Sequence, residues 1–193
     1  TLSSSSANAT TVGSVTIDNG QTLAVTTALS FVVPVTNSTC TINGGTMANT
    51  NGGVGSSFFT SDSANKNMDI VLGTGGGTLS VLGPSTAISI YTGLIMGTGP
   101  LTVNGTATLR LTTRTNIYSG DTFVTGGRLQ VSTTANVLPQ STALTLNSPG
   151  ELNIQNTLTV ASLSGDGPIS GTSAGILTIT GTSSTTYSGI MQN

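Results

Sequence analysis

Short stretches in which every second residue is apolar recur along most of the chain, separated by glycine- and asparagine-rich breaks. Successive side chains of an extended strand point to opposite faces, so each stretch would bury two or three apolar residues on one face. Strands this short and this numerous predict an all-β fold with little or no helix. The stretches are Val15–Ile17, Leu23–Val25, Thr39–Ile42, Met68–Leu72, Leu79–Val81, Ile88–Ile90, Leu101–Val103, Leu109–Leu111, Leu129–Val131, Leu144–Leu146, Leu152–Ile154, Leu158–Val160 and Leu177–Ile179.

Two all-β architectures fit this rhythm, and an internal repeat favours one of them. A sandwich joins antiparallel strands through tight hairpins, whereas a parallel β-helix winds in one direction and stacks its coils at about 4.8 Å. Three segments share a Leu-x-[Leu/Val/Ile] strand followed by a Tyr-[Ser/Thr]-Gly tripeptide, and these tripeptides hold every tyrosine of the chain. A repeated unit that cannot bury its own apolar face needs neighbouring copies, so we expect a parallel β-helix. The six repeated positions are Tyr91, Gly93, Tyr118, Gly120, Tyr187 and Gly189.

The recurring tyrosines have two interpretations. Their rings could stack into an aromatic ladder for carbohydrate, or their hydroxyls could pin a turn of the backbone. Because each tyrosine is tied to the same place in the repeat, we favour the second interpretation and assign all six positions a structural role in turns.

The segment from about Gly93 to Val131 carries the densest pattern. It contains Gly97–Leu101 (Gly-x-Gly-x-Leu), Leu109–Thr112, Tyr118–Gly120 and Thr122–Val131 in that order. This order resembles the autotransporter-associated β-strand repeat, and the resemblance extends over roughly residues 75–193, with a partial second copy from Leu163 to Ile190. Thr113-Arg114 and Ile117 depart from the family pattern. The resemblance implies a right-handed parallel β-helix on a bacterial surface or secreted from it, and it implies no particular catalytic or ligand residues.

The size of one coil sets the expected number of coils. Coils of about 18 to 27 residues divide the chain into about 7 to 10 coils. We expect a single β-solenoid domain over residues 1–193, with looser coils over 1–75 and repeat-like coils over 76–193.

The amino-acid composition excludes several classes of partner and of catalytic site. Only four Lys and Arg are present, too few to neutralise a run of phosphates, so we expect no nucleic-acid partner. The chain has no histidine, which excludes a Ser-His-Asp system and a zinc site built on imidazole. No apolar run reaches the length of a membrane-spanning helix. The 38 Thr and 25 Ser leave a surface of hydroxyls with a net charge of −2, which suits an extracellular protein that associates.

The candidate chemistry rests on six acids: Asp18, Asp62, Asp69, Asp121, Glu151 and Asp166. Asp62 and Asp69 bracket a polar segment and are weak candidates for calcium ligands, although the spacing is not that of an EF-hand and a solvated loop is the favoured interpretation. A polysaccharide-active β-helix enzyme would need two or three converging carboxylates. Only Asp62 and Asp69 are close in sequence, so we assign no catalytic residue, no metal and no cofactor. Cys40, the single cysteine, is expected to be a small buried side chain.

We therefore expect a structural, non-enzymatic protein of the cell exterior. One hypothesis is a rigid solenoid that associates head-to-tail with copies of itself or forms an adhesive surface stalk, since uncapped solenoid ends expose unpaired backbone groups. The final residues, Ile190–Asn193, stop inside a repeat, and the start is expected to follow a removed signal peptide. Two alternatives are a passenger fragment of an autotransporter that binds a glycan or host surface, and a polysaccharide-active enzyme.

Overall fold

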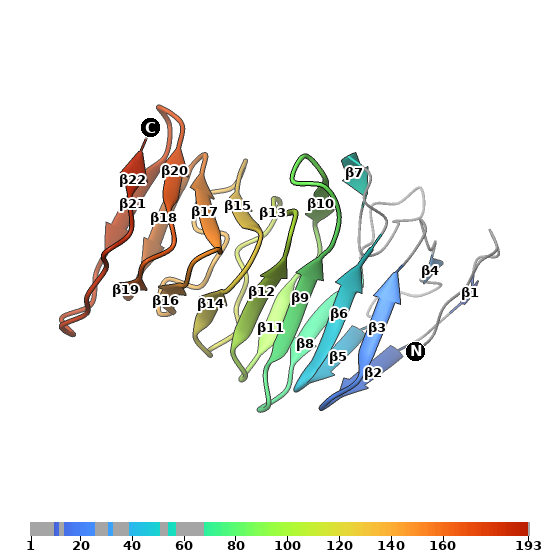
Figure 1. Cartoon of the computed structure of the whole chain (residues 1–193). Helices are drawn as coiled ribbons and strands as arrows, with labels where there is room; N and C mark the ends of the chain where they lie inside the picture. Colours follow the sequence, from blue (N-terminus) through green and yellow to red (C-terminus); the bar gives the residue numbers. More distant parts are fainter. Residues whose placement is uncertain are drawn as a thin grey trace.

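The computed structural model describes residues 10–11, 14–25, 31–32, 39–50, 54–56 and 68–192. Within these ranges the chain is built from strands and turns without a helix, and hence without a helix that could cross a membrane. The strands stack side by side into an elongated spiral (Figure 1).

Two long parallel sheets and one shorter sheet form the walls of the spiral. Sheet 1 contains β3 (Thr22–Val25), β6 (Gly45–Asn49), β9 (Gly77–Val81), β12 (Leu101–Gly105), β14 (Thr122–Val124), β16 (Ala143–Leu146) and β19 (Ser162–Gly165). Sheet 2 contains β7 (Val54–Ser56), β10 (Ile88–Tyr91), β13 (Thr108–Leu111), β15 (Arg128–Val131), β17 (Glu151–Ile154), β20 (Ile169–Gly171) and β22 (Met191–Gln192). Sheet 3 contains β2 (Ser14–Asp18), β5 (Thr39–Asn43), β8 (Asp69–Leu72) and β11 (Ile95–Gly97).

Two further pairs complete the strands. They are β1 (Thr10–Thr11) with β4 (Phe31–Val32), and β18 (Thr157–Val160) with β21 (Ile176–Ile179). From β5 to β13 the chain visits sheet 3, sheet 1 and sheet 2 in turn, so three strands make one coil. Between β13 and β14 the third side is a strand-free segment whose backbone still bonds to β11, with the amides of Ile117 and Ser119 donating to the carbonyls of Ile95 and Gly97.

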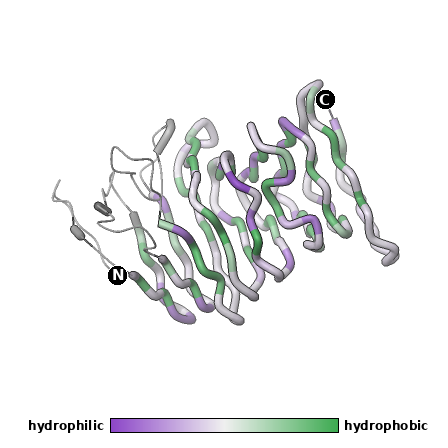
Figure 2. Tube along the Cα trace, turned by 180° about the vertical axis from the view of Figure 1, so that it is seen from behind, coloured by the Kyte–Doolittle hydropathy of each residue, from purple (hydrophilic) through white to green (hydrophobic). Residues whose placement is uncertain are grey.

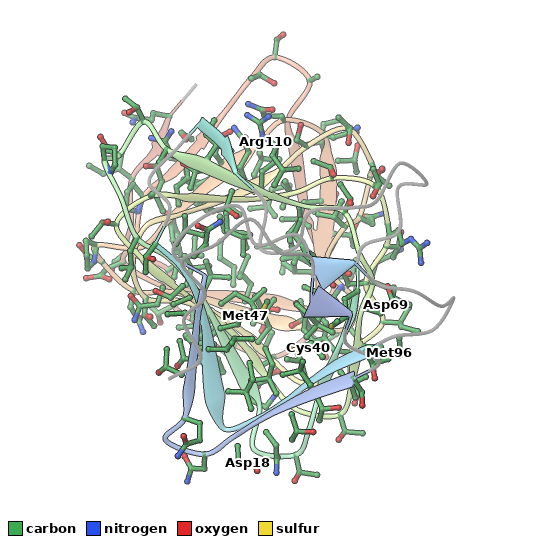
Figure 3. The ribbon with its side chains drawn as sticks, turned by 90° about the vertical axis from the view of Figure 1, so that its right-hand side faces the viewer. Asp18, Cys40, Met47, Asp69, Met96 and Arg110 are labelled. Atoms are coloured by element: carbon green, nitrogen blue, oxygen red, sulfur yellow. The ribbon has the colours of Figure 1, made fainter. Side chains whose placement is uncertain are left out.

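The core is a set of columns that run along the axis. On sheet 1, register pairing places buried apolar side chains directly above one another from β3 to β16: Leu23, Met47, Leu79, Val103, Val124 and Leu146. Apolar positions recur in this way on successive coils (Figure 2), and Met47 and Cys40 lie inside the ring of strands seen along the stack (Figure 3). Because each side chain is covered by the same position of the coils on both sides, no coil completes its own core.

The parallel β-solenoid predicted from the sequence is confirmed. The ladders between the named strands are all parallel in the described residues, which rules out the hairpin-linked sandwich there. Every predicted apolar stretch lies within a strand, with only Met68 falling one residue before β8. The described residues make about six turns, against the 7 to 10 coils expected for the whole chain. Some coils are longer than expected, since Gly45 of β6 pairs with Gly77 of β9.

The Gly-x-Gly pattern marks a corner where two coils touch. A Cβ added to Gly97 would overlap the carbonyl oxygen of Leu72, and one added to Gly99 would overlap that of Gly73. Gly97 also has a φ of +114°, a conformation that side chains disfavour. The second copy repeats this contact, with Gly165 against Leu146 and Gly167 against Gly150. The glycines are therefore required by close approach of one coil's backbone to the coil before it.

Three ionisable groups lie in the core. Burial raises the pKa of the Cys40 thiol to about 12 and the pKa of the Tyr118 phenol above its usual value. The pKa of Tyr91 is also raised, mainly by burial and secondarily by the charge of Asp69. In each case the folded state holds the proton more tightly than the unfolded chain does.

We predict that the Gly99→Ala variant loses far more stability than Gly20→Ala. Gly20 has a φ of +73° with nothing within 4 Å of an added Cβ, so alanine there meets only backbone strain, about 1–2 kcal/mol. Alanine at Gly99 must instead push two coils apart, and we expect a loss of at least about 3 kcal/mol. Urea unfolding, monitored by circular dichroism, measures the loss in unfolding free energy for each variant. Equal losses for the two variants would contradict the corner contact.

We also predict an alkaline limit to stability. Because the folded pKa values of Cys40, Tyr91 and Tyr118 are raised, the free energy of unfolding is unaffected by these groups below their ordinary pKa values, near 9.0 for Cys and 10.0 for Tyr. It falls as the pH rises above them. Phenolate absorbance and circular dichroism, recorded over one pH titration, test this. Two of the three tyrosines should ionise only as the sheet signal is lost; ionisation of all three at an ordinary pKa in an intact sheet is the opposing result.

Candidate functional site

The three repeat tyrosines direct their hydroxyls into the protein's own backbone and side chains. The hydroxyl of Tyr91 donates to the carbonyl of Met68 at 2.9 Å, and that of Tyr187 donates to the carbonyl of Gly167 at 2.7 Å. The hydroxyl of Tyr118 is hydrogen-bonded to that of Thr122 at 2.6 Å. Tyr91 and Tyr118 are only 3% and 1% exposed, so neither offers a ring face to a carbohydrate.

The glycine of each Tyr-x-Gly tripeptide lies where a side chain would collide. A Cβ on Gly93 or on Gly189 would overlap the hydroxyl of the tyrosine two residues earlier, and a Cβ on Gly120 would overlap the backbone of Gly99. The glycine thus leaves room for the tyrosine hydroxyl or for the neighbouring coil. The turn role of the six positions stays a prediction, and this geometry gives its physical reason.

Three of the described acids bind backbone amides of neighbouring coils. Oδ1 of Asp69, Asp121 and Asp166 accepts hydrogen bonds from the amides of Leu94, Ala143 and Ser148, at 2.9, 3.4 and 2.8 Å respectively. Asp62, the other candidate calcium ligand, lies outside the described residues. Among the residues that are described, no three His, Cys, Asp or Glu side chains gather closely enough to hold a metal ion.

Asparagines join coils in the same way. Buried Asn116 accepts a bond from the amide of Ile95 at 2.7 Å and donates one to the carbonyl of Val137 at 2.7 Å, so it bridges the coil before and the coil after. Asn43 and Asn136 accept bonds from backbone amides of the following coil. Asp and Asn side chains of this kind could in principle bind a ligand, but here they hold adjacent coils together by hydrogen bonds.

A column of linked polar side chains lies on the outer face of sheet 2, and we call it the polar column: Arg110, Gln130, Asn153 and Ser170. Strand register places these four residues one above another. Nε of Arg110 donates to Gln130, whose Nε2 donates to Oδ1 of Asn153 at 2.9 Å. Nδ2 of Asn153 then donates to Oγ of Ser170 at 2.9 Å. The column crosses four coils without a break in its hydrogen bonds.

An ion pair stands beside the polar column. The Arg128 guanidinium lies 3.0 Å from Oε2 of Glu151, directly above it in the register of β15 and β17. Oε1 of Glu151 accepts a hydrogen bond from Oγ of Ser170 at 2.7 Å, which ties the pair to the column. The two side chains remain 44% and 22% exposed, so both charges stay open to solvent while their positions are fixed.

Sequence reasoning missed this assembly because its members are 17 to 23 residues apart. The sequence did offer one signal, which is the alignment of the predicted strands of successive coils with one another. Once Leu109, Leu129 and Leu152 are aligned as inward residues, their polar neighbours Arg110, Gln130 and Asn153 must align outward.

Comparison with known proteins identifies one part of the chain. Neither the curated proteins nor the solved structures that were searched include a match. The family model described as passenger-associated-transport-repeat matches residues 101–131, which run from the start of β12 to the end of β15. This match confirms the resemblance to the autotransporter-associated repeat where the sequence pattern is densest. Residues 101–131 are therefore similar to a passenger-associated-transport-repeat.

Proposed function

We propose that this chain is a structural stalk of an autotransporter passenger-type protein, displayed on the outer surface of a bacterium and not an enzyme. The repeat match over residues 101–131, set in an uninterrupted stack of parallel coils, is the observation that carries the proposal. The description of that family associates such repeats with passengers and with transport.

The chemistry of the described residues supports a stalk. The described carboxylates with side-chain partners bind backbone amides, Arg128 or Ser170, which are scaffold contacts. The core columns pass from coil to coil, which favours a single solenoid domain over residues 1–193 and a stiff rod. A hydroxyl-rich surface with few charges suits an extracellular location.

Surface display is the prediction that tests this function. An epitope tag inserted into the exposed turn 181–186 of the natural full-length protein should be labelled by antibody on intact cells of the bacterium that encodes it. The same tag in a periplasmic protein, as a control, should be labelled only after the outer membrane is permeabilised. A tag on this protein that becomes accessible only after permeabilisation would exclude surface display.

A second proposal is that the stalk associates head-to-tail with a second copy. The last described coil carries exposed apolar side chains, with Ile176 at 56%, Ile179 at 49%, Ile190 at 70% and Met191 at 57%. The strands of this coil, β21 and β22, lie at sheet edges in the described structure, so their backbone groups can template another parallel strand. A copy seated there would bury the apolar side chains and continue both ladders.

We predict that the 193-residue chain forms rods whose length increases with concentration in sedimentation velocity and electron microscopy. Replacing Ile179 and Ile190 by Lys should abolish the rods, because two charges would then be buried at the contact. Ile117→Lys is the matched control: Ile117 is 62% exposed, and it lies in the middle of the stack and not on its last coil. If the unmodified chain stays monomeric over the concentration range, head-to-tail association is wrong.

A further inference from the structure

A groove of about 320 Å³ opens on the corner between sheet 1 and sheet 2, along the side of the stack. Its lining comes from four successive coils, through Ser85, Thr106, Gly127 and Glu151 among others. Three steps between coils give it a length of about 14 Å. A groove of this volume falls in the lower part of the range that small-molecule sites occupy.

The polar wall of the groove is the Arg128–Glu151 ion pair. The position of Glu151 is fixed by its hydrogen bond from Ser170, which is bonded in turn to Asn153 of the polar column. The guanidinium presents donors and the carboxylate presents acceptors 3.0 Å apart, which is the alternation that neighbouring hydroxyl groups of a ligand can match. A site held in place in this way loses little freedom when a ligand binds.

The rest of the lining is small and uncharged. Thr106 is anchored to the coil before it, since its Oγ1 donates to the carbonyl of Gly83 at 2.7 Å and accepts from the amide of Gly83 at 3.1 Å. Gly105 and Gly127 add surface without side chains, and Pro149 adds an exposed apolar ring. A flat ligand with hydroxyls on its edge can therefore approach the backbone closely.

The charge and polarity of the lining indicate which class of ligand the groove could bind. Arg128 and Glu151 cancel each other, so the lining has no net charge and gives no preference for a phosphate or a cation. The lining contains no large hydrophobic side chain that would hold an apolar ligand. What remains is a neutral molecule with many hydroxyls, of a length that covers several coils.

We propose that this groove binds a neutral oligosaccharide, with Arg128 and Glu151 hydrogen-bonding adjacent hydroxyls and the glycine-rich corner supporting a sugar ring. This proposal deepens the proposed function. It rests on that function in one respect: a protein displayed on a cell surface meets glycans, which cover cell surfaces. No aromatic side chain lines the groove, so a single groove binds weakly, and several copies of the chain displayed together would bind through multivalency.

The test is a titration of the purified, isotope-labelled chain with maltotriose, xylotriose, N-acetylchitotriose and trigalacturonic acid, followed by amide NMR shifts. At least one neutral trisaccharide should bind, with shifts concentrated at residues 105–108, 127–128 and 151. Arg128→Gln and Glu151→Gln should each weaken binding about tenfold, the loss expected when a hydrogen bond to a charged group is removed. Because Arg128 is on the surface, thermal unfolding should show that the variants remain folded.

Arg114→Gln is the matched control, since it removes the same charge from an exposed arginine outside the groove. Its affinity should equal that of the unmodified chain. The proposal is overturned if no neutral trisaccharide shifts the groove amides, if only trigalacturonic acid binds, or if Arg114→Gln weakens binding as much as Arg128→Gln. This titration uses purified protein, so it is independent of the surface-display experiment.

Discussion

The dependence of each coil on its neighbours is the constraint from which the rest of this structure follows. A coil contributes one or two inward side chains per strand, and these become a core only when the coils before and after cover them. The backbone makes the same demand, because strand amides and carbonyls bond between coils and not within one. Where the third side of the coil lacks a strand, Asn116 replaces part of that ladder by bonding to both adjacent coils.

This dependence explains a composition that is unusual in globular proteins. Side chains that reach one coil spacing are favoured, so Asn, Asp, Thr and Tyr act as connections between coils. Glycine is required where backbones approach too closely for a Cβ, as at Gly99. Long charged side chains are few, and among the described residues Arg110 and Arg128 lie on the outer face, where each also bonds to the following coil.

Much of the fold could be predicted from the sequence, because inward apolar pairs keep a period of two inside each strand. Strands without two apolar residues at alternate positions escaped this pattern: β6 (Gly45–Asn49), β14 (Thr122–Val124) and β19 (Ser162–Gly165). Alignment between coils was harder to read than the strands themselves, because coil length varies. Thr46, Thr78 and Thr102 lie in one outward column although their sequence spacings differ, and the polar column was hidden for the same reason.

The groove beside the polar column shows how a scaffold acquires a site without departing from its repeat. Arg128 and Glu151 occupy ordinary outward positions of β15 and β17, and only register brings their charges together. A solenoid can thus vary its outward side chains freely while its inward columns and corner glycines remain fixed.

Amide hydrogen exchange of the Asn116→Leu variant tests the interdependence of the coils most directly. Leucine has the same branching at Cγ and removes both side-chain bonds of Asn116 to its neighbours. The account predicts that protection falls in β11, in the coil before, and around residues 136–138, in the coil after. A loss of protection confined to residues 112–120 would show that each coil is stable by itself and would contradict the account.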